Sequence, residues 1–161
     1  MPAPTLPAMQ EFVLDDLAAT RRLAQELAAA VQPGDLLLLD GPLGAGKTAL
    51  VRFLVEALGG DPAQVASPTF TLLHQYAARL PVIHVDAYRL AGAGDLAGLG
   101  FDELSEGALG VIEWAERVAC AFPAEVCWSV NLAHAGEDRR RVRLATPLRL
   151  RGKWLHVPDE G

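Results

Sequence analysis

Apolar positions recur at helical spacing in two segments of the first third of the chain. In residues 14–35, Leu23, Leu27 and Val31 lie four residues apart, after an aspartate pair that can cap a helix and before a Pro-Gly pair that ends one. Residues 47–60 have the same amphipathic pattern and end in two glycines. We therefore predict a helix in each segment.

Other apolar segments have the length or the alternation of strands. Residues 36–39 are a continuous apolar run, as expected of a strand that is covered on both faces. Residues 67–90 predict two strands joined by a turn near 77–81, and residues 110–113 predict a strand that leads into a helix. Alternation over 126–144 predicts two further strands, joined by a turn at 135–138.

Strands thus alternate with helices in the first part of the chain, and hairpins dominate its end. This order predicts an α/β fold with a mostly parallel central sheet and added antiparallel strands at the C-terminal end. We expect one domain over 1–161, with residues 1–10 as a frayed lead and 124–158 as the C-terminal antiparallel strands. Glycines break residues 91–108 into short helical pieces.

Composition is that of an ordinary globular chain. The 161 residues are 51% hydrophobic and 21% charged, which is enough to bury a core and excludes a disordered chain. No apolar run approaches the ~18 residues that cross a membrane, and the first residues lack the features of a secretory signal. We expect a cytoplasmic protein without a membrane partner, in which Cys120 and Cys127 are small buried residues rather than a disulfide.

Charge is distributed unevenly along the chain. A net charge of −6 argues against a general nucleic-acid coat, and we expect no DNA partner. Half of the basic residues nevertheless lie in one basic strip, which consists of Arg139, Arg140, Arg141, Arg143, Arg149, Arg151 and Lys153. A basic strip on an acidic chain suggests a localised contact with an anionic partner. The alternative, favoured for any one residue, is that these side chains pair with nearby acids.

Residues 41–48, GPLGAGKT, fit the phosphate-loop pattern G-x-x-x-x-G-K-[ST] between a strand and a helix. Glycines let the backbone approach phosphate oxygens, and the following helix adds N–H donors. Lys47 is expected at the β- and γ-phosphates of a bound nucleotide and Thr48 at Mg²⁺, whereas Ala49 offers only its backbone N–H. The expected nucleotide-binding residues of the loop are Gly41, Leu43, Gly44, Ala45, Gly46, Lys47, Thr48 and Ala49.

Two acids end apolar strands, as a magnesium–triphosphate site requires. Asp86 ends PVIHVD and Glu113 ends LGVIE, and such strand ends meet at one edge of an α/β sheet. Either acid could hold Mg²⁺ directly, hold it through water, or orient an attacking water. The alternative for each is a cap on the following helix. For His84, on the same strand face as Asp86, and for Trp114, we favour core packing.

Five segments in this order resemble the TsaE family, formerly YjeE, of tRNA threonylcarbamoyladenosine biosynthesis. They are residues 41–48, 67–72, 84–90, 100–104 and 111–118. The resemblance implies a Mg²⁺-dependent ATPase with a three-layer, P-loop NTPase-like fold. It also implies protein partners of the TsaB and TsaD type, which transfer a threonylcarbamoyl group to the adenosine following the anticodon.

The resemblance further implies roles for single residues. Thr48 and Glu113 would bind Mg²⁺, Asp86 would support hydrolysis, and Thr20, in the first helix, would lie near the adenine. The chain departs from the family at Pro42, where an acid is usual, and at Ala49, where a hydroxyl is usual. These departures affect the expected affinity and hydrolysis rate more than nucleotide binding itself.

The resulting hypothesis is hydrolysis on the phosphate loop. Lys47 and Mg²⁺ would neutralise charge on the γ-phosphoryl group while Asp86 or Glu113 positions water. Arg89 is a candidate internal arginine finger, and turnover would be slow without the partners. Two alternatives stay open: a small-molecule kinase, for which residues 89–109 make a poor lid with Arg89 as their only basic residue, and a nucleotide-dependent binding module without required turnover.

Overall fold

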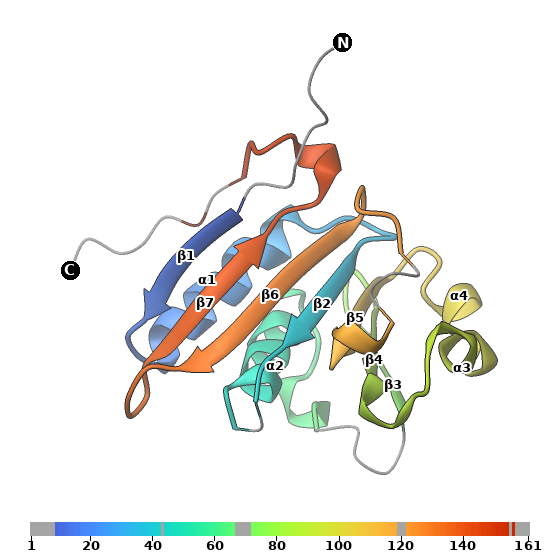
Figure 1. Ribbon diagram of the computed structural model, residues 1–161, viewed down its shortest axis with the longest axis horizontal. Helices are drawn as coiled ribbons and strands as arrows, with labels where there is room; N and C mark the ends of the chain where they lie inside the picture. The colour runs from blue at the N-terminus through green and yellow to red at the C-terminus, as the bar shows by residue number, and fades with distance from the viewer. Residues whose placement is uncertain (1–8, 43, 67–71, 119–121, 155, 157–161) are drawn as a thin grey trace.

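Seven strands form one sheet in the computed structural model, which describes residues 9–42, 44–66, 72–118, 122–154 and 156 (Figure 1). The spatial order is β1-β7-β6-β2-β5-β4-β3. The strands are β1 Met9–Leu14, β2 Leu36–Asp40, β3 Leu73–Tyr76, β4 Val82–Asp86, β5 Leu109–Glu113, β6 Cys127–His134 and β7 Arg140–Ala145.

The centre of the sheet is parallel and its two sides are antiparallel. Strand β2 pairs parallel with β5 and β6, and β5 pairs parallel with β4. Antiparallel pairs add β3 to β4, β7 to β6 and β1 to β7. The expected α/β fold with a parallel core is confirmed, with the difference that β6, placed among the antiparallel strands, also completes the parallel core.

Strand β1 differs from the sequence expectation. Residues 9 and 10, expected in the frayed lead, already pair with Ala145 and Leu144 of β7. In this strand alternate positions are exposed, while Phe12 and Leu14 pack on the core. The alternation is short, which explains why the sequence pattern did not reveal it.

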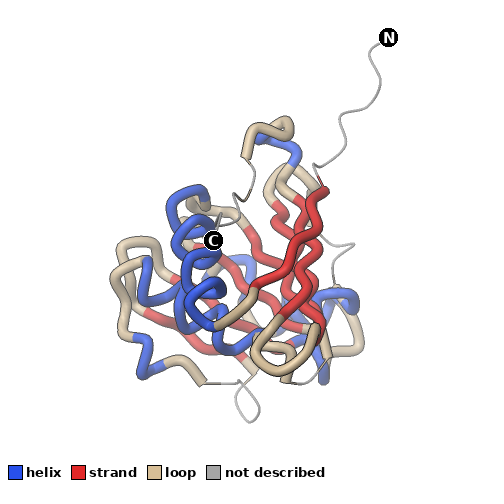
Figure 2. The backbone as a smooth tube through the Cα atoms, turned by 90° about the vertical axis from the view of Figure 1, so that its left-hand side faces the viewer, coloured by secondary structure: helices blue, strands red, loops and turns tan. Residues whose placement is uncertain are grey.

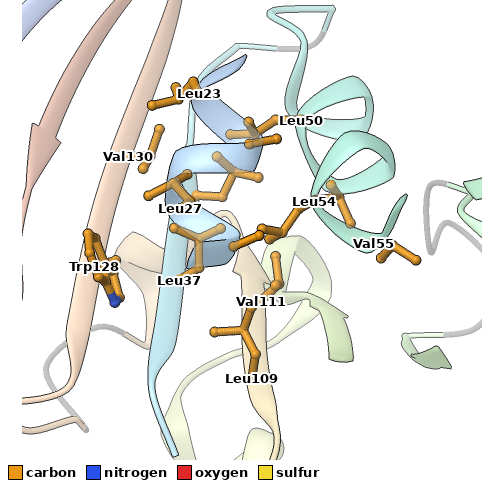
Figure 3. Close-up of a cluster of buried hydrophobic side chains, with 14 of the residues drawn as sticks. Leu23, Leu27, Leu37, Leu50, Leu54, Val55, Leu109, Val111, Trp128 and Val130 are labelled. Atoms are coloured by element: carbon orange, nitrogen blue, oxygen red, sulfur yellow. The ribbon is translucent and has the colours of Figure 1, made fainter. Parts of the chain in front are cut away.

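One face of the sheet is covered by α1 Leu17–Ala30 and α2 Lys47–Ala57, which form where expected. The Asp16 side chain caps α1 by accepting the Ala19 N–H at 2.8 Å. Leucines and valines of both helices meet Leu37, Val111 and Trp128 of the sheet (Figure 3). Truncating one such buried leucine to alanine typically costs about 2–5 kcal/mol.

The opposite face is covered over only part of its width. The short helices α3 Ala93–Gly98 and α4 Phe101–Leu104 pack with β2, β4 and β5 in a second cluster of buried residues. The same face of β1, β7 and β6 has no helix over it in Figure 1, and Glu11, Asn131, Arg141 and Arg143 are exposed there. Figure 2, a quarter turn away, shows the twist of the sheet.

The helix expected after β5 is a single 3-10 turn, η3 Ala115–Arg117, before residues that lie outside the described part of the chain. Further 3-10 turns among the described residues, η1 Pro62–Gln64, η2 Ala87–Arg89 and η5 Leu148–Leu150, connect other elements. No helix in the described ranges is long and apolar enough to cross a membrane. Cys127 is half-buried, and this burial raises the pKa of its thiol to about 11, while Cys120 lies outside those ranges.

Three arginines of the basic strip pair with acids, which confirms the favoured interpretation for them. Arg139 lies 3.2 Å from Asp15, and Arg143 lies 2.8 Å from Glu11, both at the surface. Arg149 pairs with the buried Asp35, which also accepts the Trp128 indole N–H at 3.1 Å. This last pair ties η5 to the start of β2.

Burying the carboxyl group of Asp40, the last residue of β2, is energetically unfavourable. Its Oδ1 is buried, with no hydrogen-bond partner among the described residues. Burial first, and then the neighbouring Glu116 carboxylate, raise the pKa of Asp40 above its ordinary value. Because the native state favours the protonated form, this group contributes stability at acidic pH that is lost as pH rises through the raised pKa.

We expect Asp40→Asn to raise the thermal midpoint of unfolding at pH 7, because it removes a buried carboxylate that lies beside another acid. The gain should shrink as pH falls through the raised pKa of Asp40 and be gone below the ordinary pKa of an aspartate, where the carboxyl group is protonated in the folded and the unfolded state alike. Thermal unfolding of both proteins between pH 3 and 8 measures this. Glu116→Gln should give part of the same gain, and parallel profiles over the whole range would contradict the assignment.

Candidate functional site

The phosphate loop lies between β2 and α2, held against the end of β6. A Cβ atom built on Gly41 would lie 2.4 Å from the carbonyl oxygen of Leu132 in β6, so a side chain cannot fit there without a backbone shift. Gly46 precedes α2 with φ +103°, in the left-handed region that favours glycine. Two of the motif's glycines are therefore required by backbone contacts and geometry.

Backbone N–H groups of the loop are free of backbone acceptors. Among the described residues, the N–H groups of Gly44, Thr48 and Ala49 take part in no backbone hydrogen bond, and no side chain caps the start of α2. Unpaired N–H groups at the start of an eleven-residue helix form a local positive region. This is the donor set that an oxyanion group requires.

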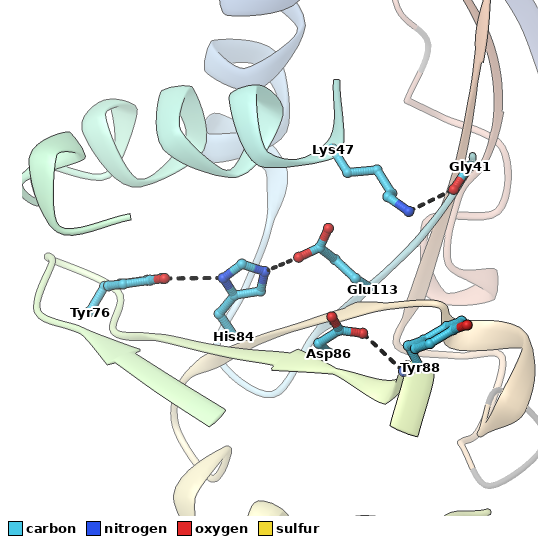
Figure 4. Close-up of polar contacts among 7 residues, drawn as sticks. All are labelled: Gly41, Lys47, Tyr76, His84, Asp86, Tyr88 and Glu113. Atoms are coloured by element: carbon cyan, nitrogen blue, oxygen red, sulfur yellow. Dashed lines mark hydrogen bonds and ion pairs between the residues drawn. The ribbon is translucent and has the colours of Figure 1, made fainter. Parts of the chain in front are cut away.

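Lys47 brings a fixed cation to the loop. Its side chain is 6% exposed, and its Nζ donates to the carbonyl oxygen of Gly41 at 2.6 Å. The same Nζ lies 4.1 Å from the centroid of the Trp114 ring, a cation–π contact (Figure 4 shows the lysine). The ammonium is therefore held at the end of β2 by a carbonyl and an aromatic face.

Trp114 departs from the core packing that its sequence context favours. It is half-buried, its ring lies 5.1 Å from that of Tyr88, and it contacts Lys47. Its φ of 58° places a bulky residue in the left-handed region, a strained conformation, while its N–H donates to Leu39 at 3.1 Å. Its only sequence signal is that it follows Glu113 directly.

Glu113 lies on β5, the strand between β2 and β4, in register with Leu39 and Asp86. Glu113 is only 4% exposed. Its Oε2 lies 2.7 Å from Nε2 of His84, and the His84 side chain is fully buried. The other ring nitrogen of His84, Nδ1, lies 3.1 Å from the Tyr76 hydroxyl (Figure 4). The described bonds of Glu113 thus involve His84 rather than a helix start.

Tyr76, His84 and Glu113 form a row of hydrogen-bonded side chains, and each bond in this row has a definite donor and acceptor. Burial raises the pKa of the Tyr76 phenol, and the Glu113 charge adds to the rise, so the phenol keeps its proton. Tyr76 therefore donates to Nδ1 of His84, which leaves the proton on Nε2 to donate to Glu113.

The histidine is thus a satisfied buried residue, as the sequence favours, and it also orients Glu113. Sequence reasoning connected His84 with Asp86, two residues along the same strand face. The connection with Glu113 depends on the parallel register of β4 and β5, which pairs His84 with Val111 and Asp86 with Glu113. A single sequence contains no direct signal of that register.

Asp86 ends β4 beside Glu113 and caps η2. Its Oδ1 accepts the Tyr88 N–H at 2.9 Å, so the capping alternative holds for this acid. A cap and a role at a bound ligand are compatible, because a carboxylate has two oxygens. The candidate arginine finger Arg89 belongs to η2, but its side chain lies outside the described part of the structure.

The remaining expected residues separate into three groups. Thr48 and Ala49 lie in the first turn of α2, whereas the Ala45 side chain is fully buried in the core. Thr20 is buried in α1, and its hydroxyl donates to Asp16 at 3.4 Å, so no described contact joins it to the loop. Leu43 lies outside the described residues, as does most of the segment 67–72.

The structure therefore brings Gly41, Lys47, Thr48, Asp86 and Glu113 to one edge of the sheet. The described residues contain no cluster of three or more His, Cys, Asp or Glu side chains that would hold a metal by themselves. Free N–H groups and an ammonium beside one buried carboxylate suit a phosphate chain together with a divalent cation that shares its oxygens.

Comparisons with known proteins agree with this geometry. Residues 14–142 match the model of the family Threonylcarbamoyl adenosine biosynthesis protein TsaE. The chain is 35% identical to a tRNA threonylcarbamoyladenosine biosynthesis protein TsaE of Rickettsia felis, over 84% of this chain and 79% of the relative. The chain is also 38% identical to the protein of the same name in Bacillus subtilis, over 76% of this chain and 77% of the relative.

A crystal structure of Bacillus subtilis YdiB superposes with a TM-score of 0.69 at 29% identity, over 88% of each chain. The two proteins therefore share one fold over most of their length. With a family model that matches most of its length and relatives above 30% identity, this chain belongs to the TsaE family.

Proposed function

We propose that this protein is a Mg²⁺-dependent ATP hydrolase that acts in the threonylcarbamoyl modification of tRNA. The observation that carries the proposal is the placement of Lys47 and Glu113 around a loop with free N–H groups. Membership of the TsaE family supports the modification pathway. The target is then the adenosine next to the anticodon, and the chain acts in the cytoplasm, where tRNA is modified.

The residues present fit ATP and Mg²⁺. The loop offers donors for phosphate oxygens, and Thr48 and Glu113 offer the hydroxyl and carboxylate oxygens that Mg²⁺ prefers. When bound, Mg²⁺ supplies charge neutralisation on the phosphates. Asp86, in register with Glu113, is the second carboxylate within this edge of the sheet.

Each side chain then has a defined task. Lys47 binds the β- and γ-phosphates, and Asp86 or Glu113 orients the attacking water and holds its proton. The row from Tyr76 through His84 keeps the Glu113 carboxylate in one orientation. Because the arginine finger that would complete the charge at the γ-phosphate is left to Arg89 or to a partner, we expect slow hydrolysis by the chain alone.

The proposed partners are proteins of the TsaB and TsaD type. They would bring the tRNA close to the ATPase, and a complex with them would hydrolyse ATP faster than this chain does. Arg141, Arg151 and Lys153 of the basic strip are exposed and suit contacts with tRNA phosphates or with an acidic face of a partner. Adenine recognition by Thr20 stays a prediction from the family resemblance.

Lys47→Ala should abolish ATP binding and, with it, tRNA modification in a mixture with the partner proteins, because it removes the fixed cation of the loop. Lys153→Ala, at the chain's other lysine, is the matched control for ATP binding and phosphate release by the chain alone, without tRNA or partners. Nucleotide titration, phosphate release and modified adenosine are measured in parallel. Full ATP binding by Lys47→Ala would refute the site, and modification that needs neither the protein nor ATP would refute the function.

Tyr76→Phe and His84→Gln should lower Mg²⁺-dependent hydrolysis about 10–100-fold, the usual effect of disturbing the partner of a metal ligand. Affinity for ATP without Mg²⁺ should change little, because Lys47 and the loop amides are untouched. His74→Gln serves as control, since His74 lies opposite His84 in the sheet but does not contact Glu113 in the described structure. Equal hydrolysis by all three variants would remove the row from the mechanism.

A further inference from the structure

Arg140 lies against the phosphate loop, although it is far from the loop in sequence. Its Nε lies 3.4 Å, and its Cδ 4.0 Å, from the position that a Cβ on Gly46 would occupy. His134, its partner across the β6–β7 ladder, has its Nε2 3.8 Å from the corresponding position on Gly44. The turn end of the β6–β7 hairpin therefore forms a wall of the loop.

This proximity follows from the sheet order. Strand β6 pairs parallel with β2, so the two strands end at the same edge of the sheet, and the loop leaves from that edge (Figure 1). The close approach of Gly41 to Leu132 joins the loop directly to β6 two residues before His134. Arg140 is the first residue after the hairpin turn and pairs with His134. Its cation therefore also lies beside the loop.

Arg140 differs from its neighbours in the basic strip. Arg139, Arg143 and Arg149 each pair with a carboxylate, whereas within the described residues Arg140 has none. Its Nη1 instead donates to the carbonyl oxygens of Glu137 and Arg139, both at 2.9 Å. These bonds hold a half-buried guanidinium in place and leave its charge without a protein counter-ion.

We propose that Arg140 is a second cationic ligand of the phosphate chain, on the β6 side of the loop. Lys47 approaches from the side of Gly41 and Trp114, and Arg140 approaches at Gly46. A guanidinium with an unneutralised charge, fixed beside free loop N–H groups, is complementary to phosphate oxygens. The inference rests on the proposed ATPase function and adds to the same site a residue outside the phosphate-loop motif.

The test is a titration with ATP and with inorganic tripolyphosphate, which has the phosphates but no base or sugar. Arg140→Gln should weaken both ligands about tenfold or more, the usual loss of a hydrogen bond to a charged group. Arg140→Lys should keep most of the affinity, because it keeps the charge. Arg143→Gln is the matched control, an exposed arginine of the same strand that pairs with Glu11, and it should bind both ligands as wild type does.

Three outcomes would overturn the inference. Equal weakening by Arg140→Lys and Arg140→Gln would assign the effect to the carbonyl bonds of the turn rather than to charge. Weakening for ATP but not for tripolyphosphate would place the arginine at the base or sugar. Unchanged or tighter binding by Arg140→Gln would exclude a favourable phosphate contact.

A measurement on the wild-type protein keeps the test independent of whether Arg140→Gln folds. The Nε–H resonance of Arg140, assigned by its disappearance in Arg140→Lys, should shift when tripolyphosphate is added, and an unshifted resonance in the bound protein would overturn the inference. The two levels of proposal also fail differently. If wild type binds no ATP, or Lys47→Ala binds it fully, the proposed function fails; if Lys47 is required and Arg140 is not, only this inference fails.

Discussion

The parallel pairing of β2 with β5 on one side and β6 on the other is the constraint on which the site depends. Because parallel strands end at the same edge, this pairing brings the phosphate loop, Glu113 and the turn of the β6–β7 hairpin together. Strand β2 itself contributes mainly buried leucines, which pack against helices on both faces of the sheet and fix its position. The geometry of the site at this edge of the sheet therefore depends on how the buried side chains of β2 pack in the middle of the sheet.

Two carboxylates near this edge of the sheet, those of Glu113 and Asp40, differ in whether their hydrogen bonds are satisfied. Glu113 is buried with its hydrogen-bond partner, and the histidine that bonds it is fixed in turn by a tyrosine. Asp40, one strand away, has a buried oxygen without a partner and a second acid nearby. A satisfied carboxylate is positioned at little cost, whereas an unsatisfied one lowers stability at neutral pH.

Local signals in the sequence were sufficient for most of the elements and for the phosphate loop. The continuous apolar run before Gly41 and the motif after it identify a strand, a loop and a helix without tertiary information. The row from Tyr76 to Glu113 could not be predicted, because it depends on register between strands that are far apart in the chain. The same holds for Arg140, whose place at Gly46 follows from the position of β6 and not from any motif.

Strand β1 was missed for a related reason, since its pairing partner lies more than a hundred residues away. That pairing has a consequence for how the molecule assembles. Gln10 exchanges hydrogen bonds with His156, so the first described strand is held by the last described residue. Contacts of such sequence separation require closure of nearly the whole chain and slow the search for the native topology. Strand β1 can therefore take its place in the sheet only after β7, far along the chain, has joined β6.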